Sequence, residues 1–235
     1  PMSVPQFLIA PSIDPLSDKN KELDMAYIHT VLERYGLNPE RPILTQISRF
    51  DRLKDPLGVI AAYRLVKRNY DCQLVLAGGG ADDDPQAAQV LREVEEAAET
   101  DPDIHVLLLP PFSDLEINAL VRGSTIVLQK SIKEGFGLTV SEALWKKKPV
   151  IGGAVGGIKV QIINGITGFL VHSPEGAASR AIELLANPQL RQRLGENGHR
   201  HIKQNFLITR HVKDYLLLML ALDYPKDRII QLPAP

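Results

Sequence analysis

Short apolar runs alternate with longer amphipathic stretches along most of this chain. Six runs rich in Val, Ile and Leu are predicted to be strands: 43–48, 73–77, 104–109, 125–129, 149–152 and 169–171. Most of these runs do not alternate apolar with polar residues, which is typical of strands that are covered on both faces. We therefore expect one sheet with helices on both sides.

Helical patterns fill the intervals between the predicted strands. Two of them start with proline directly after an aspartate, Asp55 or Asp84, and aspartate is a good N-cap. A third begins with Ser113 and Glu116, which have the spacing of a capping box. The predicted helices are 20–35, 56–67, 85–99, 113–121, 138–147, 175–186, 190–205 and 209–222.

This order of elements predicts a mostly parallel, doubly wound α/β sheet of the Rossmann-like class, followed by extra C-terminal helices. Each parallel crossover needs a helix-sized connection, and such connections join all six predicted strands. We divide the chain into a linker with a helix (1–42), a Rossmann-like domain (43–205), and a C-terminal helix and tail (206–235).

The charge balance argues against several classes of partner. The 235 residues carry 27 Lys and Arg against 28 Asp and Glu, so no general attraction draws the chain to nucleic acid or to an anionic membrane. The longest apolar run, 216–222, is too short to span a bilayer. The single cysteine, Cys72, is interpreted as a small buried residue and fits a reducing compartment. We therefore expect a cytoplasmic protein that holds any anion with a local cluster of cations and amides.

Two cations follow the first predicted strand. Ligands of such sheets bind beyond the carboxyl ends of the strands. Arg49 and Lys54 occupy that place, where a dinucleotide-binding domain would have its glycine-rich fingerprint. They could neutralise a diphosphate by charge. A solvated basic loop is the alternative explanation.

A glycine-containing turn follows the fourth predicted strand. Gly135 and Gly137 permit a tight path into a helix, which leaves the amides around Gly137, Leu138 and Thr139 free for a phosphate. Val140 stands where a dinucleotide fingerprint would have its third glycine, so that fingerprint is absent.

Two carboxylates, Glu134 and Glu142, bracket this turn. Both can face the same cleft, and carboxylates are good acceptors for sugar hydroxyls. Their roles must differ, because one site does not tolerate two equivalent anions beside a diphosphate. The alternative is ordinary: Glu142 would interact with the helix dipole, and Glu134 would be a solvated loop residue.

The remaining motifs give weaker indications of function. The glycines of 152–157 lack the spacing of a phosphate loop, and either close approach to a ligand or tight packing explains them. Gly78–Gly80 with Asp82–Asp84 is interpreted as a turn with a helix cap rather than a cation site. The histidines have no partners at ligand spacing, so no metal site is expected.

Several segments together resemble a known family, the retaining nucleotide-sugar glycosyltransferases of the GT-B fold, glycosyltransferase family 4. They are Arg49 with Lys54, 134–142 (EGFGLTVSE), Gly156 with Gly157, and 164–171 (NGITGFLV). Within that family, 11–20 (PSIDPLSDKN) and 154–159 (AVGGIK) are most similar to the branch that forms trehalose and to the retaining trehalose phosphorylases.

The resemblance implies roles for the site residues. Arg49 and Lys54 would hold the donor diphosphate, and Glu134 would position or stabilise the reacting sugar, so these three form the expected catalytic set. Glu142 would bind the nucleotide ribose. The remaining substrate-binding residues would be Gly135, Phe136, Gly137, Leu138 and Thr139. Neither a metal nor a cofactor is then required, and UDP-glucose or ADP-glucose is the substrate.

The implied function is that of a hexosyltransferase which moves glucose from a nucleotide-glucose to glucose and forms trehalose with retention. A trehalose phosphorylase, another family-4 transferase and a non-catalytic nucleotide-sugar-binding module stay open as alternatives. A GT-B enzyme also has an N-terminal domain for the acceptor. With one predicted sheet and a start at Pro1-Met2, this chain is expected to be the C-terminal half, inactive alone, and a homodimer is a further expectation.

Overall fold

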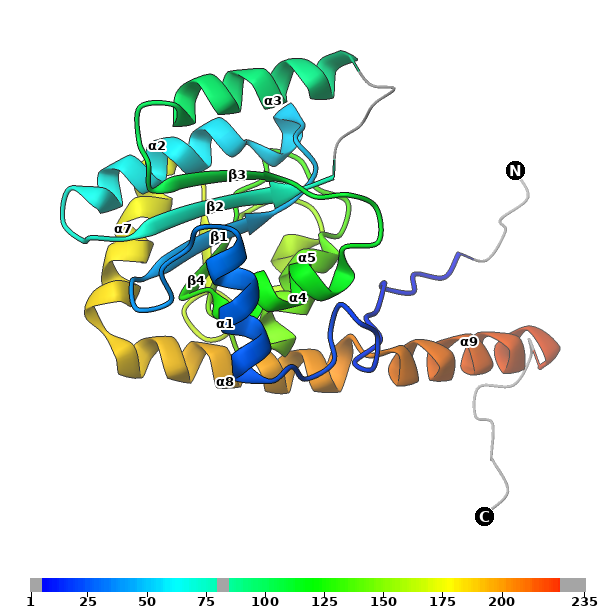
Figure 1. Cartoon of the computed structure of the whole chain (residues 1–235). Helices are drawn as coiled ribbons and strands as arrows, with labels where there is room; N and C mark the ends of the chain where they lie inside the picture. The colour runs from blue at the N-terminus through cyan, green and yellow to red at the C-terminus, as the bar shows by residue number, and fades with distance from the viewer. Residues whose placement is uncertain (1–5, 80–84, 225–235) are drawn as a thin grey trace.

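A six-stranded parallel sheet forms the centre of the chain (Figure 1). In the computed structural model, which describes residues 6–79 and 85–224, the strand order is β3-β2-β1-β4-β5-β6. The strands are β1 Ile43–Ile47, β2 Gln73–Gly78, β3 Ile104–Leu108, β4 Ile126–Gln129, β5 Val150–Gly153 and β6 Phe169–Val171. The predicted doubly wound α/β class is confirmed, and each strand lies where the sequence predicts it.

Helices cover both faces of this sheet. They are α1 Met25–Arg34, α2 Pro56–Lys67, α3 Pro85–Ala98, α4 Asp114–Gly123, α5 Leu138–Trp145, α6 Ile158–Gln161, α7 Pro174–Ala186, α8 Pro188–Asn205 and α9 Ile208–Asp223, with a 3₁₀ turn, η1, at Arg52–Lys54. The predicted helices are all present, and most of their ends agree closely with the structure. The short elements η1 and α6 were not predicted.

Helices α1 and α4 are capped differently from the prediction. Helix α1 begins at Met25 rather than at residue 20, because the Asp24 carboxylate accepts a hydrogen bond from the Ala26 amide (2.9 Å) and caps the helix there. Ser113 forms no capping box, since its hydroxyl donates instead to the Pro110 carbonyl (2.8 Å). Asp55 does cap α2, whereas Asp84 lies outside the described residues.

The core has two layers, one on each face of the sheet. Helices α2, α3 and α7 pack over one face, where Tyr63 is among the largest fully buried side chains. Helices α1, α4 and α5 pack over the other, and α1 adds Ile28, Val31 and Leu32 to that layer. The expected divisions of the chain after residues 42 and 205 stay predictions.

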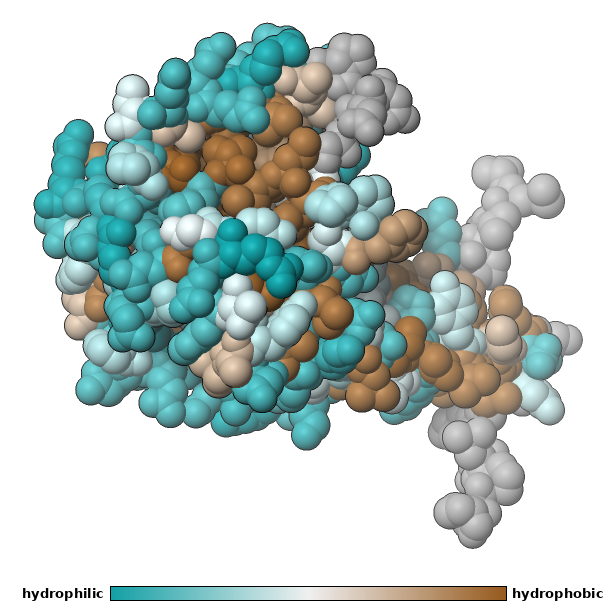
Figure 2. All heavy atoms as spheres, viewed as in Figure 1, coloured by the Kyte–Doolittle hydropathy of each residue, from teal (hydrophilic) through white to brown (hydrophobic). Residues whose placement is uncertain are grey.

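Helix α9 extends away from the sheet, beside the N-terminal part of the chain (Figure 1). Two backbone hydrogen bonds join the start of this region to the N-terminal part: Ile13 N donates to Phe206 O (2.9 Å), and Ile208 N donates to Ile13 O (3.0 Å). None of the described residues of α9 is buried, and Figure 2 shows apolar surface along it. No described helix is both long enough and apolar enough to cross a membrane.

Candidate functional site

A cleft of about 430 Å³ opens at the carboxyl ends of β1 and β4, where the strand order reverses direction. Such a reversal is the place where doubly wound sheets bind ligands. The lining residues are Pro11, Lys19, Ile47, Ser48, Arg49, Lys54, Gln129, Glu134, Phe136, Gly137, Leu138, Thr139 and Glu142. The structure thus brings together all the predicted site residues except Gly135, which does not line the cleft.

The two predicted cations lie on the turn that follows β1. The Asp51 carboxylate accepts hydrogen bonds from the amides of Leu53 (2.8 Å) and Lys54 (3.1 Å), which forms η1 and places Lys54 at the cleft. The Arg49 side chain is 73% exposed and lies 3.5 Å from a carboxylate oxygen of Asp51. Arg49 therefore keeps most of its donors open to the cleft and to solvent.

Lys54 and Glu134 form an ion pair within the cleft. Lys54 Nζ lies 2.5 Å from Glu134 Oε2, and the two side chains are only 18% and 10% exposed. Glu134 also accepts hydrogen bonds from the Ser131 hydroxyl (3.3 Å) and the Gly135 amide (3.1 Å). Glu134 is therefore not a solvated loop residue, since each member of the pair compensates the charge of the other.

The loop that carries Glu134 packs against the glycine turn after β5. A Cβ atom on Gly156 would lie 1.7 Å from the Glu134 carbonyl oxygen, and the Gly157 amide donates to the Gly135 carbonyl (2.8 Å). Tight packing, rather than an approach to a ligand, explains these glycines. Gln161 strengthens the same contact, because its amide donates to the Phe136 carbonyl (2.5 Å).

The start of α5 forms the floor of the cleft. Gly137, with φ of +82°, is the N-cap residue, and among the described residues no side chain caps the helix. The amides of Leu138 and Thr139 thus stand at the positive end of the helix dipole, as predicted for an anion site. The Thr139 hydroxyl donates to Oε1 of Gln129 (3.1 Å), a cleft residue that was not predicted from the sequence.

Glu142 lies one turn inside α5 and is 7% exposed. In the described parts of the chain, no group forms a hydrogen bond or ion pair with its carboxylate, although the residue lines the cleft. Burial raises the pKa of Glu142, and the positive charges of Lys19 and Lys146 oppose that rise. The Glu142 oxygens are not among the fully buried atoms left without a partner, so they face the open space of the cleft, where a ligand hydroxyl could donate to them.

Lys146, four residues after Glu142, is the C-cap residue of α5, and it too is buried. Its ammonium donates to Asn20 Oδ1 (2.9 Å) and to the Glu142 carbonyl (3.1 Å), not to the Glu142 carboxylate. Burial lowers the pKa of Lys146 to about 7. Both side chains therefore shift towards their neutral forms.

Part of the cleft comes from a segment that precedes the sheet. Pro11 and Lys19 line the cleft although they precede the sheet by many residues, and only the resemblance of 11–20 pointed to that segment. Lys130, which follows β4 and does not line the cleft, forms an ion pair with Asp55, the N-cap of α2.

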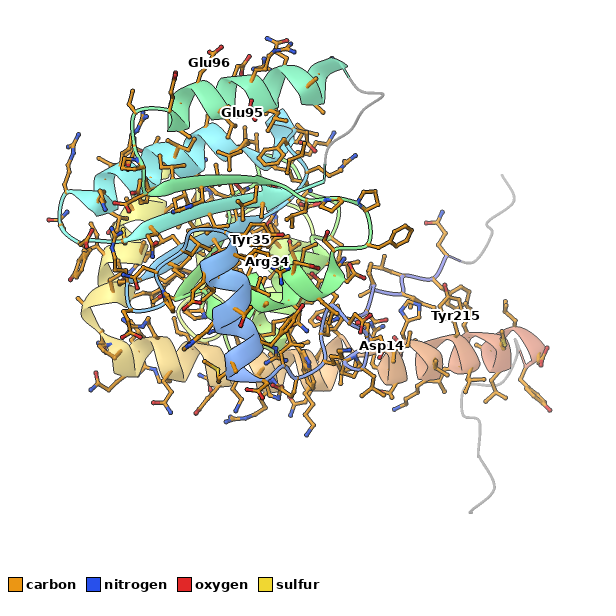
Figure 3. All side chains as sticks on the ribbon, viewed as in Figure 1. Asp14, Arg34, Tyr35, Glu95, Glu96 and Tyr215 are labelled. Atoms are coloured by element: carbon orange, nitrogen blue, oxygen red, sulfur yellow. The ribbon has the colours of Figure 1, made fainter. Side chains whose placement is uncertain are left out.

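A larger hollow, of about 600 Å³, lies between α3 and the edge strand β3. Its lining includes Glu95, Glu96, Glu99 and Asp101, and Figure 3 labels the first two on α3. These carboxylates would repel a diphosphate, so the smaller cleft is the candidate site.

No described group of three or more His, Cys, Asp or Glu side chains could hold a metal ion. Cys72 is buried, and burial raises the pKa of its thiol to about 11, which confirms its interpretation as an unreactive core residue. The motif of Gly78–Gly80 and Asp82–Asp84 falls largely outside the described residues.

The fold is that of a Rossmann-like domain, with a cleft at its topological switch point. Residues 29–201 match the family described as glycosyl transferases group 1. The chain belongs to this family.

Two curated relatives illustrate the similarity. The chain is 47% identical over 218 residues to trehalose synthase of Thermococcus litoralis, a match that covers 90% of this chain and 52% of the relative. It is 33% identical over 183 residues to trehalose phosphorylase of Pleurotus pulmonarius, which covers 70% of this chain and 25% of that protein. The chain thus spans about half the length of the trehalose synthase and about a quarter of the length of the trehalose phosphorylase.

Solved structures share the fold. Sucrose-phosphate synthase from Thermosynechococcus elongatus has a TM-score of 0.77 at 22% identity, over 94% of this chain and 53% of that one. Anabaena HepE in complex with UDP and glucose has a TM-score of 0.73 at 16% identity, over 85% of this chain and 53% of that one. The C-terminal domain of a group 1 glycosyl transferase from Francisella tularensis has a TM-score of 0.63 at 24% identity, over 76% of this chain and 92% of that one. The chain therefore has the fold of one half of a GT-B glycosyltransferase.

Proposed function

We propose that this chain is the donor-binding domain of a retaining glucosyltransferase that moves glucose from UDP-glucose or ADP-glucose to glucose and forms trehalose. One observation carries the proposal: the cleft is lined both by Glu142, whose carboxylate has no hydrogen-bond or ion-pair partner among the described residues, and by the cations Arg49 and Lys54. A nucleotide-sugar has hydroxyls that can donate hydrogen bonds to the carboxylate and a diphosphate that the cations attract.

The diphosphate would bind between these cations and the start of α5. Arg49 has donors free for a phosphate, and the amides of Leu138 and Thr139 face the same cleft. Negative charge grows on the diphosphate as the bond to the sugar breaks. Fixed cations and a helix N-terminus at that place would stabilise the leaving group.

Glu134 would position the transferred sugar rather than attack it. Its carboxylate is engaged by Lys54, Ser131 and the Gly135 amide, which leaves it poorly suited to be a nucleophile. In the front-face route, the bond between the glucose anomeric carbon and the diphosphate oxygen breaks. The acceptor oxygen bonds to that carbon on the same face, and its proton goes to the departing phosphate.

The acceptor site would come from an N-terminal domain that these 235 residues do not contain. The relatives named trehalose synthase are about twice as long as the matched region. A stand-alone binding module would be expected to pack all of its last helices on its own domain. Helices α7 and α8 do so, with Ala181 and Ile202 in the core, but no described residue of α9 is buried. The match to trehalose phosphorylase keeps phosphorolysis as a second candidate, which product analysis of the whole enzyme with phosphate or nucleotide-glucose would separate.

Calorimetry of the 235-residue chain with UDP and with ADP tests the donor site. We expect binding of at least one of them, and a loss of about 10- to 100-fold in affinity for Arg49→Ala, because hydrogen bonds to charged groups are worth about 1.5–3 kcal/mol. The matched control is Arg52→Ala, since Arg52 lies on the same turn but pairs with Glu93 (2.9 Å) and does not line the cleft. Absence of binding by the unmodified chain, or an equal affinity of the Arg49 variant, would refute the proposal.

A further inference from the structure

The segment of residues 11–21, here called the leading segment, is fastened to the domain by buried polar groups. Asn118 on α4 is fully buried, and its amide donates to the carbonyls of Asp18 and Lys21, both at 2.8 Å. Arg122, one turn further along α4, donates to the carbonyl of Asn20 (3.1 Å). Buried polar side chains are costly unless they are satisfied, so these contacts specify one conformation of the segment.

Asn20 completes this fastening from within the segment. Its side chain is buried and donates to the Asp14 carbonyl (3.0 Å) and the Ser17 hydroxyl (3.2 Å), while its Oδ1 accepts from Lys146 (2.9 Å). Figure 3 labels Asp14 on the stretch between the sheet domain and α9. The backbone on both sides of Lys19 is therefore held in place.

This arrangement brings the Lys19 side chain to the cleft. Its ammonium lies 3.3 Å from Asp114 Oδ1, and the two side chains are 33% and 48% exposed. Such an exposed pair is weak and leaves other ammonium donors free.

Lys19 belongs to the Glu142 side of the cleft. Both residues line it, and no ion pair within 4 Å joins these two described side chains. The charges that act on the pKa of Glu142 are those of Lys19, Lys146 and Asp114, with Lys19 first, and not those of Arg49 or Lys54. An ammonium and an unpartnered carboxylate thus face one cleft without touching each other.

We propose that Lys19 is a ribose-binding residue that acts together with Glu142 on the vicinal diol of the nucleotide. A hydroxyl group is both a donor and an acceptor. The two hydroxyls of the diol would each donate a hydrogen bond to the Glu142 carboxylate, and one hydroxyl oxygen would accept a hydrogen bond from the Lys19 ammonium. The inference rests on the proposed function, because it takes the ligand of the cleft to be a nucleotide.

The test compares the Lys19→Met chain with the unmodified chain by calorimetry, using ADP and UDP and their 2′,3′-dideoxy analogues. Methionine keeps much of the side-chain length and removes the charge. We expect the variant to bind the better ribonucleotide about tenfold more weakly, as fits the loss of one charged hydrogen bond. Its affinity for the dideoxy analogue should stay unchanged, because that ligand has no diol to contact.

Lys21→Met is the matched control. Lys21 lies on the same segment and carries the same charge, but its ammonium pairs with Asp18 (2.6 Å) and it does not line the cleft. This variant should bind all ligands as the unmodified chain does.

Three results would overturn the inference. An unchanged ribonucleotide affinity of the Lys19 variant would show that the ammonium makes no contact. An equal loss for ribonucleotide and dideoxy analogue would indicate general electrostatic attraction. In both cases a weakened Arg49→Ala variant would leave the proposed function standing, whereas absence of any nucleotide binding by the unmodified chain would overturn both.

Discussion

A methyl group added at Gly156 would test how closely the two loops beside the cleft are packed. Gly156 has φ of +44°, and its added Cβ would lie 1.7 Å from the carbonyl oxygen of Glu134. Contacts under 3.0 Å essentially never occur for a Cβ atom. The Gly156→Ala change must therefore push the Glu134 loop away by roughly 1 Å or more, because close-packed interiors leave no free space to absorb the shift.

The expected loss of stability has two parts. A left-handed backbone costs a non-glycine residue about 1–2 kcal/mol. Displacement of the loop also breaks or lengthens the hydrogen bond from Gly157 to Gly135, worth about 1 kcal/mol, and loosens the pair of Lys54 with Glu134. We expect Gly156→Ala to lower the free energy of unfolding by about 3 kcal/mol, which is about 10 °C in Tm for a domain of this size.

Two other glycines separate the contributions. Gly165 has φ of +75° but nothing within 4 Å of its added Cβ, so Gly165→Ala should cost about 1 kcal/mol from the backbone alone. Gly135 has neither a left-handed φ nor a neighbour within 4 Å, so Gly135→Ala should change stability by about 0.5 kcal/mol or less. The three variants would be compared by urea and thermal unfolding, with UDP and ADP affinity as a second measurement. A Gly156 variant as stable as the Gly165 variant would refute the close packing of the two loops.

Two further predictions concern ion pairs. Lys54→Met and Glu134→Gln should each destabilise the chain by about 2–3 kcal/mol, because each leaves one charge buried without its partner. The double variant should lose less stability than the sum of the two single variants, and additive losses in urea unfolding would contradict a coupled pair. Hydrogen bonds from Arg41, together with those from Lys67, hold the pKa of Asp103 well below its usual range. Asp103→Asn should therefore lower the free energy of unfolding by about 2 kcal/mol at pH 7. The difference in stability between the two proteins should shrink only as the pH falls below about 4, where the carboxyl of the unfolded chain takes up its proton. A difference that stays constant down to pH 2 in urea unfolding would disprove the role of the charge.

The predictions from the sequence that the structure confirms are those with one dominant physical cause. Strands β1 and β2 were predictable because all of their residues are buried, which removes the alternation of polar residues. Arg49, Lys54 and Glu142 could be selected because strand ends at a switch point converge on one place. Ser113 shows the limit of capping rules that use residue type and spacing alone, because its hydroxyl donates to the Pro110 carbonyl and so does not cap the helix.

What could not be predicted depends on contacts between distant parts of the chain. Lys19 reaches the cleft only because Asn118 and Lys146, more than 90 residues later, hold the segment around it. The role of the glycine turn after β5 could not be decided from the sequence. Gly156 packs against the backbone of Glu134, and the spacing of residues in the sequence does not show that these two positions meet.

The two glutamates of one motif also show how a chain of net charge −1 can offer an anion site. Glu134 is neutralised by Lys54, so it does not oppose a diphosphate by its full charge. Burial raises the pKa of Glu142, which weakens its repulsion as well, and Lys19 faces it from the leading segment. Arg49 then remains as a cation whose charge is only partly compensated, next to the uncapped start of α5. Because Coulomb interactions fall off within about 10 Å in salt, this local excess outweighs the balance of the whole chain.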